Sequence, residues 1–379
     1  MASDGFDEAC LLTGYPAFGA RQMLTQIVSE EPRTRVYVVV KNKLGTAADE
    51  HLATLTTEQR ERVVVLDGDA ASMDLGLSGA EFRELTQNVT RIHHCAQVSY
   101  LGVDNAEAER VNVQATREVL EIAHHCARLR LLVHHSTAFV AGDRTGTVHE
   151  TELDADQGFR NIVEETKARA ERLVRRSMAT LPIAVVRPTS IVGDTVSGEV
   201  DRLDGPYLLV LLLVTSPADI ALPLPAKGDA PLHLVPVDFV TRAAHHIGRD
   251  PRAAGRTFHL ADPRPLTAMR AFELIAYAAG RRSPKGFIPA NLTRALLHTP
   301  GLEKFAKSPR TFLDQLVTPV RFDTRNADTI LAGTGIVCPP LESYVDKMVT
   351  FVRERVRERR ERRAEVEHTA EKEIDDPLG

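Results

Sequence analysis

The chain has 379 residues, of which 43% are hydrophobic and 26% charged, with a formal net charge of -5. This length and composition suit a large α/β domain with a smaller lobe, and the negative charge argues against a nucleic-acid-binding protein, which is normally basic. The longest apolar run, residues 208–214, is far shorter than the roughly 20 residues that cross a bilayer. The first residues are acidic and polar, so we expect a cytoplasmic protein without a transmembrane helix.

Short β-branched runs alternate with longer segments of helical spacing over the first 190 residues. Helical spacing is clearest at residues 108–127 and 162–179. Near-continuous apolar strands between helices are typical of a parallel sheet covered on both faces, so the pattern predicts a doubly wound Rossmann-type α/β fold. The six runs predicted as buried strands are residues 9–12, 36–40, 63–66, 92–95, 131–135 and 183–186.

The pattern changes after residue 188. Residues 195–232 are rich in Gly, Pro and Leu and are predicted to be a loop-rich part of a substrate lobe. We therefore expect three parts: residues 8–260 as the dinucleotide-binding domain with that insertion, 261–345 as a smaller, mostly helical substrate lobe, and 346–379 as a charged helix with an acidic tail. Within them, short α/β elements are expected at 236–247, 257–260 and 266–279, helices and turns at 281–340, and one long helix at 341–368.

The last helix is strongly charged. Residues 353–363 hold seven Arg and three Glu around one Val. Three interpretations stay open: a solvated helix with ion pairs one turn apart, a helix that binds a protein partner, and a helix that lies on an anionic membrane surface.

A glycine turn follows the first predicted strand. The chain there reads Thr13-Gly14-Tyr15-Pro16-Ala17-Phe18, and a helix follows. Such a turn lets backbone amides and the helix N-terminus face a pyrophosphate, so these six residues are the predicted cofactor-binding turn. The expected second and third glycines are Ala17 and Ala20, and a tight turn without a ligand is the alternative.

Charged residues follow the next two strands. Lys41 and Lys43 stand where an acidic residue would favour NAD, so the sequence favours NADP(H), whose 2′-phosphate suits a cation. Asp69 follows the third strand and is predicted to accept a hydrogen bond from the adenine amino group. The alternatives are solvated lysines and an aspartate that caps a helix.

Neither the cysteines nor the histidines indicate a metal site. The four cysteines form no CxxC pair, and we expect free thiols. Four His–His pairs occur at 93–94, 124–125, 134–135 and 245–246, but adjacent side chains on a strand or helix do not converge on one ion.

Several blocks of sequence, taken in order, resemble the extended short-chain dehydrogenase/reductase superfamily. Within it the chain is most similar to the branch of thioester-reductase and fatty acyl-CoA reductase domains. The resemblance covers roughly residues 8–260. The blocks are residues 13–20, 68–69, 94–96, 111–113, 135–142, 164–167, 187–193 and 235–238.

The resemblance implies an active site that lacks one member. It makes Thr137 the residue that orients the substrate oxygen, Lys167 the lysine that holds the nicotinamide ribose, and Asn112 a candidate for a water relay. The proton-donating tyrosine belongs at position 163, where this chain has Val163. Valine has no ionisable group, and the loss of general acid–base catalysis typically costs about 10²–10⁴-fold in rate.

Two functions stay open. The first is an NADP(H)-dependent reductase of an apolar acyl thioester or another carbonyl compound. The second is a catalytically degenerate member that acts as a dinucleotide-binding regulator or protein scaffold, and an isomerase or epimerase is a third possibility on this fold. Each site residue also has a structural alternative: Thr137 as a strand-end cap, Lys167 as a solvated helix lysine, and Asn112 as a bridge between backbones.

Overall fold

Seven parallel strands form the central sheet, in the order β10-β7-β5-β4-β1-β2-β3. The computed structural model describes residues 5–100, 102–216, 228–283, 286, 316 and 318–375, and the side chains of the last helix up to residue 362. All six predicted strands are confirmed, and the seventh lies at 257–260. In chain order they are β1 (Glu8–Thr13), β2 (Thr34–Val40), β3 (Val63–Asp67), β4 (Arg91–His94), β5 (Leu131–His135), β7 (Ile183–Pro188) and β10 (Thr257–Leu260).

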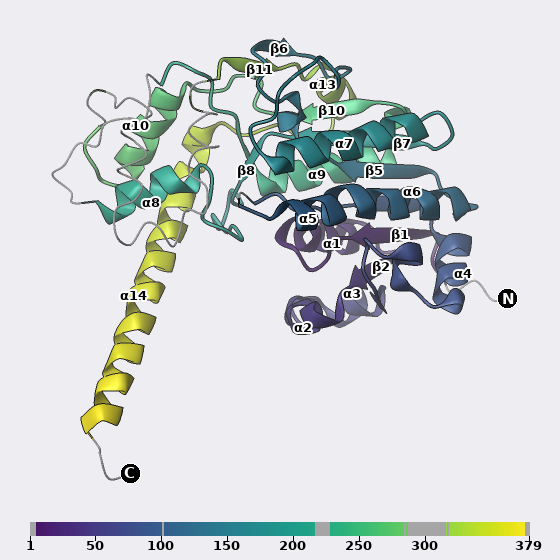
Figure 1. Cartoon of the computed structure of the whole chain (residues 1–379), viewed down its shortest axis with the longest axis horizontal. Helices are drawn as coiled ribbons and strands as arrows, with labels where there is room; N and C mark the ends of the chain where they lie inside the picture. The colour runs from purple at the N-terminus through teal and green to yellow at the C-terminus, as the bar shows by residue number, and fades with distance from the viewer. Residues whose placement is uncertain are drawn as a thin grey trace.

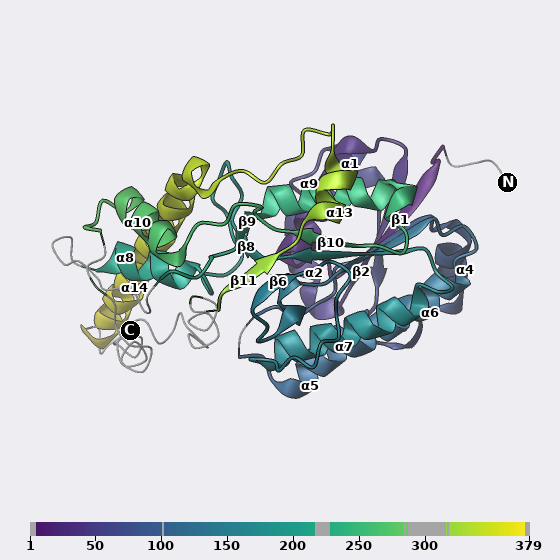
Figure 2. The same ribbon diagram turned by 90° about the horizontal axis from the view of Figure 1, so that it is seen from above.

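Helices cover both faces of this sheet, which confirms the doubly wound class (Figure 2). One face carries α1 (Phe18–Glu30), α9 (Val237–Arg249) and α13 (Arg325–Leu331). The other carries α4 (Gly79–Asn88), α6 (Ala115–His125) and α7 (Ile162–Ser177). The remaining helices of this domain are α2 (Gly45–Leu52), α3 (Thr57–Glu61) and α5 (Asn105–Ala108), which leads through a π-helical turn (Glu109–Gln114) into α6.

Strand β2 illustrates why the strands read as continuous apolar runs. Val36, Val38 and Val40 pack toward α1 and α9, whereas Tyr37 and Val39 pack toward the opposite layer. A strand buried on both faces needs apolar residues at every position, so it loses the alternation of a half-exposed strand.

A helical lobe lies beside the carboxyl edge of the sheet (Figure 1). It contains α8 (Tyr207–Thr215), α10 (Ala268–Ala278) and α14 (Val345–Asp375), which pack around one apolar cluster. Two small sheets join it to the main domain: β8 (Ser190–Val192) with β9 (Leu234–Pro236), and β6 (Gly146–Val148) with β11 (Val320–Phe322). Of the helices and turns predicted at 281–340, about half lie outside the described residues. The described part contains α13, as predicted, and also the strand β11, which was not predicted. The three-part domain division stays a prediction.

The insertion at 195–232 differs from the predicted loop. Its residues 207–215 form α8, whose side chains are buried nearly all round against α10 and α14. A helix buried on all sides shows no apolar–polar period, which is why its sequence did not indicate a helix.

The long helix α14 begins at Val345, after a 3₁₀ turn at Leu341–Ser343. Its first turn lies against Gly198, where an added Cβ would stand 2.3 Å from the carbonyl oxygen of Lys347. Its charged half then projects away from the body of the protein (Figure 1). No described helix combines the length and the apolar character that a membrane span requires.

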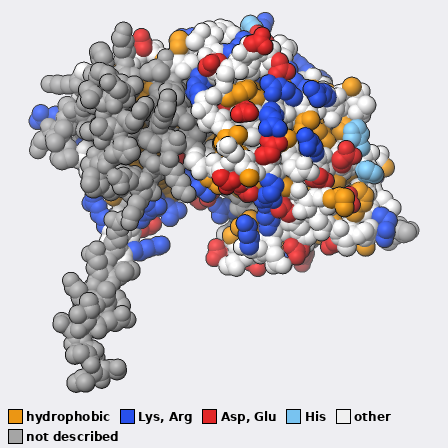
Figure 3. Space-filling model, in the orientation of Figure 1, with side chains coloured by type: hydrophobic (Ala, Val, Ile, Leu, Met, Phe, Trp, Pro, Cys, Tyr) orange, Lys and Arg blue, Asp and Glu red, His pale blue; other side chains and the backbone are white. Residues whose placement is uncertain are grey.

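Lys and Arg side chains are interleaved with Asp and Glu on the surface that Figure 3 presents. Ion pairs of this kind connect neighbouring elements. One example is Arg169 of α7, which forms two hydrogen bonds of 2.8 and 2.9 Å with Glu109 of the π-helical turn.

Candidate active site

The glycine turn lies at the point where the strand order reverses, between β1 and β4. In open parallel sheets this is where ligands bind, outside the carboxyl ends of the strands. Gly14 has a φ of +84°, and a Cβ on it would stand 2.6 Å from the backbone atoms of Cys95 and Ala96. Only glycine fits there, so the turn and the end of β4 pack backbone against backbone.

The turn leaves the N-terminus of α1 open. The Ala17 amide donates to the Gly14 carbonyl at 3.0 Å, and the helix begins at Phe18 without a side-chain cap. Ala17 and Gly19 are exposed, and nothing lies within 4 Å of a Cβ built on Gly19. The first-turn amides are therefore uncapped by side chains and available to an anion, although Ala17 replaces a glycine.

The other residues of the predicted cofactor-binding turn point into the protein. Thr13 Oγ1 is hydrogen-bonded to His94 Nδ1 at 2.8 Å, and the Tyr15 hydroxyl donates to the Ala48 carbonyl at 3.0 Å. Pro16 and Phe18 are also buried. These side chains fix the shape of the turn, so any contact of this turn with a dinucleotide is left to its backbone.

Lys41 and Asp69 meet at the ends of β2 and β3. Lys41 Nζ lies 3.1 Å from Asp69 Oδ2, which also accepts from Arg110 at 2.7 Å, while Lys43 is exposed. Asp69 Oδ1 accepts from the Ala71 amide at 3.0 Å. Burial favours a higher pKa for Asp69, but these hydrogen bonds outweigh it and lower the pKa below its usual range.

Two cations thus meet the Asp69 carboxylate, and Arg110 also pairs with Glu107 at 2.9 Å, so the cluster holds two cations and two carboxylates. Arg110 was not found from the sequence, because it lies 41 residues beyond Asp69 in the chain. Only the packing of the π-helical turn against the sheet edge brings the two together.

A cavity of about 220 Å³ lies between the end of the sheet and the entry to the lobe. Thr137, Val163 and Lys167 all line it, and residues 204–206 of the lobe entry close part of its rim. The structure therefore brings together two of the three polar residues that the resemblance implied, beside the valine at the position of the tyrosine. Asn112 and the glycine turn are not among the described residues that line this cavity.

Helix α7 presents three of its residues to the cavity. Asn161 caps it by accepting from the Glu164 amide at 3.0 Å, which fixes where the first turn starts. Val163, Glu164 and Lys167 then follow on the side that faces the cavity. Val163 also packs in an apolar cluster with Val98, so its methyl groups fill the space without any hydrogen-bonding group.

Lys167 is almost fully buried, with 6% of its surface exposed. Burial lowers its pKa to about 7, and no described acidic side chain forms an ion pair with it. The amine therefore loses its proton far more readily than the permanently charged group of a surface lysine.

Thr137 and Asn112 both form hydrogen bonds that hold the local backbone in place. Thr137 Oγ1 accepts from the Phe139 amide at 3.3 Å and caps a short 3₁₀ helix. Asn112 is buried: its amide nitrogen donates to Thr166 Oγ1 at 2.9 Å, and its oxygen accepts from the Val98 amide at 2.8 Å. Asn112 thus ties the π-helical turn to α7, and its part in a water relay stays a prediction.

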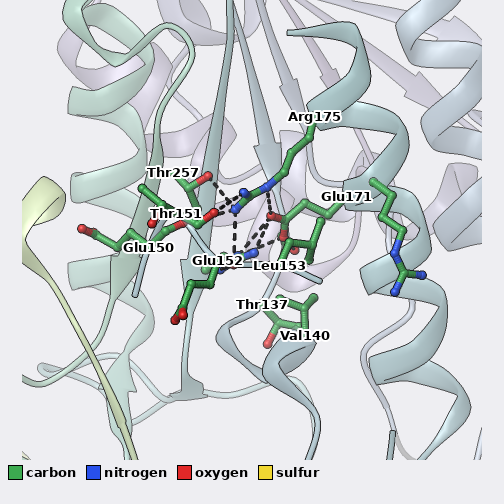
Figure 4. Close-up of polar contacts among 12 residues, drawn as sticks. Thr137, Val140, Glu150, Thr151, Glu152, Leu153, Glu171, Arg175 and Thr257 are labelled. Carbon is green, nitrogen blue, oxygen red and sulfur yellow. Dashed lines mark hydrogen bonds and ion pairs between the residues drawn. The ribbon is translucent and has the colours of Figure 1, made fainter. Parts of the chain in front are cut away.

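A buried ion network supports this wall of the cavity. Glu171 of α7 accepts from Arg187 at 2.6 Å, from Arg175 at 3.0 Å and from the Ser136 hydroxyl at 2.7 Å. Glu171 and Arg187 are fully buried, and Figure 4 shows the Arg175 side chain directed toward Glu171. Burial opposes ionisation of Glu171, but the two arginines overcome it and lower its pKa to about 2. The network fixes Ser136, the residue before Thr137.

The sheet order and the glycine turn are those of a Rossmann fold. Together with the comparisons that follow, they place the chain among the extended short-chain dehydrogenases/reductases, a class of oxidoreductases that bind nicotinamide dinucleotides, in the thioester-reductase-like branch. The model of the family described as male sterility protein matches residues 12–244. Since that is more than half of the chain, the chain belongs to this family.

Two proteins with similar sequences carry reductase names. Fatty acyl-CoA reductase 1 of Mus musculus is 26% identical over 276 residues, which are 62% of this chain and 53% of that protein. A glycine betaine reductase of Emericella nidulans is 30% identical over 220 residues, 56% of this chain and 17% of that protein. The chain spans about half the length of the fatty acyl-CoA reductases that it matches.

Among solved structures, the terminal R domain from the myxalamid PKS-NRPS biosynthetic pathway superposes with a TM-score of 0.78 at 23% identity. The match covers 93% of this chain and 92% of that one. It includes the lobe as well as the Rossmann domain, and it shows a shared fold.

Proposed function

We propose that this chain binds NADP(H) and reduces the carbonyl carbon of an apolar acyl thioester or aldehyde. The observation that carries the proposal is the placement of Thr137 and Lys167 on the walls of one cavity at the carboxyl edge of a parallel sheet. The names of the relatives, a fatty acyl-CoA reductase and a reductase domain of a biosynthetic pathway, point to the same chemistry.

The residues present fit the cofactor. The backbone of Gly14 packs directly against the end of β4, which keeps the turn tight, and no side chain caps the first amides of α1 that follow it. Lys41, 3.1 Å from Asp69 at the end of β2, is the cation that a 2′-phosphate would meet, and this supports NADP(H) over NAD(H). Arg110 is already paired with both Asp69 and Glu107. When bound, NADPH supplies the hydride.

In this proposal the protein positions the acceptor. The Thr137 hydroxyl, which donates to the Pro188 carbonyl at 3.4 Å in this structure, turns to donate a hydrogen bond to the substrate carbonyl oxygen and polarises it. Lys167 donates to the ribose hydroxyls of the cofactor. Asn112 keeps the π-helical turn and α7 in register, and residues 204–206 mark where the substrate lobe meets the cavity.

The test is binding followed by turnover. NADPH is titrated by calorimetry, and its oxidation is then followed with long-chain acyl thioesters and aldehydes. We expect binding tighter for NADPH than for NADH, turnover with at least one acyl substrate, and a loss of about 10²-fold in Thr137→Val, the effect of one lost oxyanion-type donor. Thr180→Val, at an exposed position after α7, is the control. Cofactor binding without any turnover would refute the reductase proposal.

Val163 specifically favours the second candidate, a catalytically degenerate member that binds a dinucleotide as a regulator or scaffold. Its side chain is built into an apolar cluster and offers no proton. In that case the native protein turns nothing over, and Val163→Tyr creates activity. The prediction that the charged half of α14 binds a protein partner stays a prediction.

A further inference from the structure

Glu164 is a second ionisable group in the cavity, one residue after Val163 and one helical turn before Lys167. Its side chain is 5% exposed. Oε2 accepts from the Arg160 amide at 3.1 Å, and the Arg160 guanidinium lies 3.6 Å away. Oε1 is buried and accepts a hydrogen bond from no described residue.

A buried carboxylate oxygen without a donor is costly, because it has lost water and gained nothing in return. A proton on Oε1 removes that cost and turns the oxygen into a donor. Burial accordingly raises the pKa of Glu164 above its usual range, although Arg160 opposes the shift. The other ionisable groups that line the cavity are Lys167 and Asp204, and burial also raises the pKa of Asp204, against the attraction of Arg202.

Two residues of α7 near position 163 are suited to two different tasks, holding the cofactor ribose and supplying a proton. Lys167 is four residues after position 163 and is the group that the proposed function assigns to the ribose. Glu164 lies three residues before Lys167, a spacing that places both side chains on one helix face. Both line the cavity that Thr137 also lines, so a carbonyl oxygen held by Thr137 has an acid in the same chamber.

We propose that protonated Glu164 is the proton donor to the substrate oxygen, in place of the residue that is absent at position 163. This inference rests on the proposed reductase function. For an aldehyde, the carbonyl carbon gains a hydride from NADPH and the C=O double bond becomes a single bond. The oxygen takes the proton of Glu164 Oε1, which gives an alcohol, NADP⁺ and a Glu164 carboxylate, and a proton from solvent then restores the acid.

The decisive experiment compares four proteins in aldehyde reduction with NADPH: the native chain, Glu164→Gln, Glu165→Gln and the double variant Val163→Tyr/Glu164→Gln. Gln keeps the size of the side chain but has no transferable carboxyl proton. Glu165 is the adjacent, exposed residue and serves as the matched control. We expect Glu164→Gln to lose about 10²–10⁴-fold in kcat with NADPH binding unchanged, and Glu165→Gln to lose nothing.

Two readouts separate proton donation from a structural role. The tyrosine of the double variant supplies a new donor and should restore much of the rate, which it cannot do if Glu164 only supports the fold. The kcat of the native chain should fall as pH rises through the raised pKa of Glu164, and this limb should be absent in Glu164→Gln.

A third readout does not require turnover. In ¹³C-carboxyl NMR of the cofactor-free protein, Glu164 and Glu150, whose pKa values burial raises, should both titrate above the usual range near 4.3. One of these two signals should be missing from Glu164→Gln. If Glu164→Gln unfolds, Glu164→Asp takes its place and should keep the pH limb at a lower rate. An active native chain with an unimpaired Glu164→Gln variant would overturn this inference alone. A native chain that binds NADPH and turns nothing over would overturn the proposed function and this inference with it.

Discussion

Arg187→Met should destabilise the protein strongly, because it leaves the Glu171 carboxylate buried with too few partners. Arg187 contributes the 2.6 Å contact and two further hydrogen bonds of 3.0 and 3.1 Å from Nε. Arg175 and Ser136 remain, but Arg175 is partly exposed. Breaking a buried ion pair from one side typically costs about 3–5 kcal/mol, so we expect a loss of that order in the free energy of unfolding.

Denaturant unfolding of the single variants and of the double variant Glu171→Leu/Arg187→Met measures the effect. Replacing both partners removes the unpaired charge, so the double variant should be more stable than Arg187→Met alone. Arg172→Met is the control, since Arg172 of the same helix pairs with Asp154 near the surface and should cost about 1 kcal/mol or less. A loss below about 1 kcal/mol in Arg187→Met would refute this account of the network.

Three further changes test the cofactor turn and the cavity. Gly14→Ala forces a Cβ to 2.6 Å from the Cys95 backbone. It should lower the free energy of unfolding by at least about 2 kcal/mol and abolish NADPH binding. Thermal unfolding with and without the cofactor measures both effects, and an unchanged melting temperature contradicts the close approach. Lys41→Ser removes a cation beside Asp69 and should weaken NADPH about tenfold, or 1.4 kcal/mol, with NADH unchanged in calorimetry; equal losses for both refute a 2′-phosphate contact. Burial lowers the Lys167 pKa from 10.5 to about 7, so between these values the unfolded chain binds a proton that the folded chain does not, and stability rises with pH. Lys167→Met should therefore stabilise the cofactor-free protein near pH 7, by on the order of 2–4 kcal/mol, with a gain that shrinks toward pH 10; a gain independent of pH contradicts the shift.

Much of the fold was predictable because it depends on local patterns. The six strands are apolar runs between helices, and each is in the sheet. Their order was not predictable, since crossover helices do not specify which strands become neighbours. Helix α8 was missed because a helix buried on every side has no amphipathic period.

Parts of the candidate site were predictable where blocks of this sequence could be aligned with the family's motifs. The resemblance placed Thr137 and Lys167, and the structure brings both to one cavity. Arg110 and Glu164 acquire their surroundings only through tertiary packing: one from the π-helical turn against the sheet edge, the other from burial beside Arg160. No spacing in the sequence encodes the contact between Asp69 and Arg110. Arg160 and Glu164 do have i,i+4 spacing, and it is the burial of this pair that the sequence did not show.

The way in which α14 is docked has a mechanical consequence. The helix is 31 residues long, or roughly 46 Å at 1.5 Å per residue, and only its first part is docked in the lobe. The loop that touches it at Gly198 continues directly to residues 204–206 at the rim of the cavity. The packed part of α14 extends through Val352, beyond the contact at Gly198, so a force on the free end acts first on the lobe helices α8 and α10 that hold this segment.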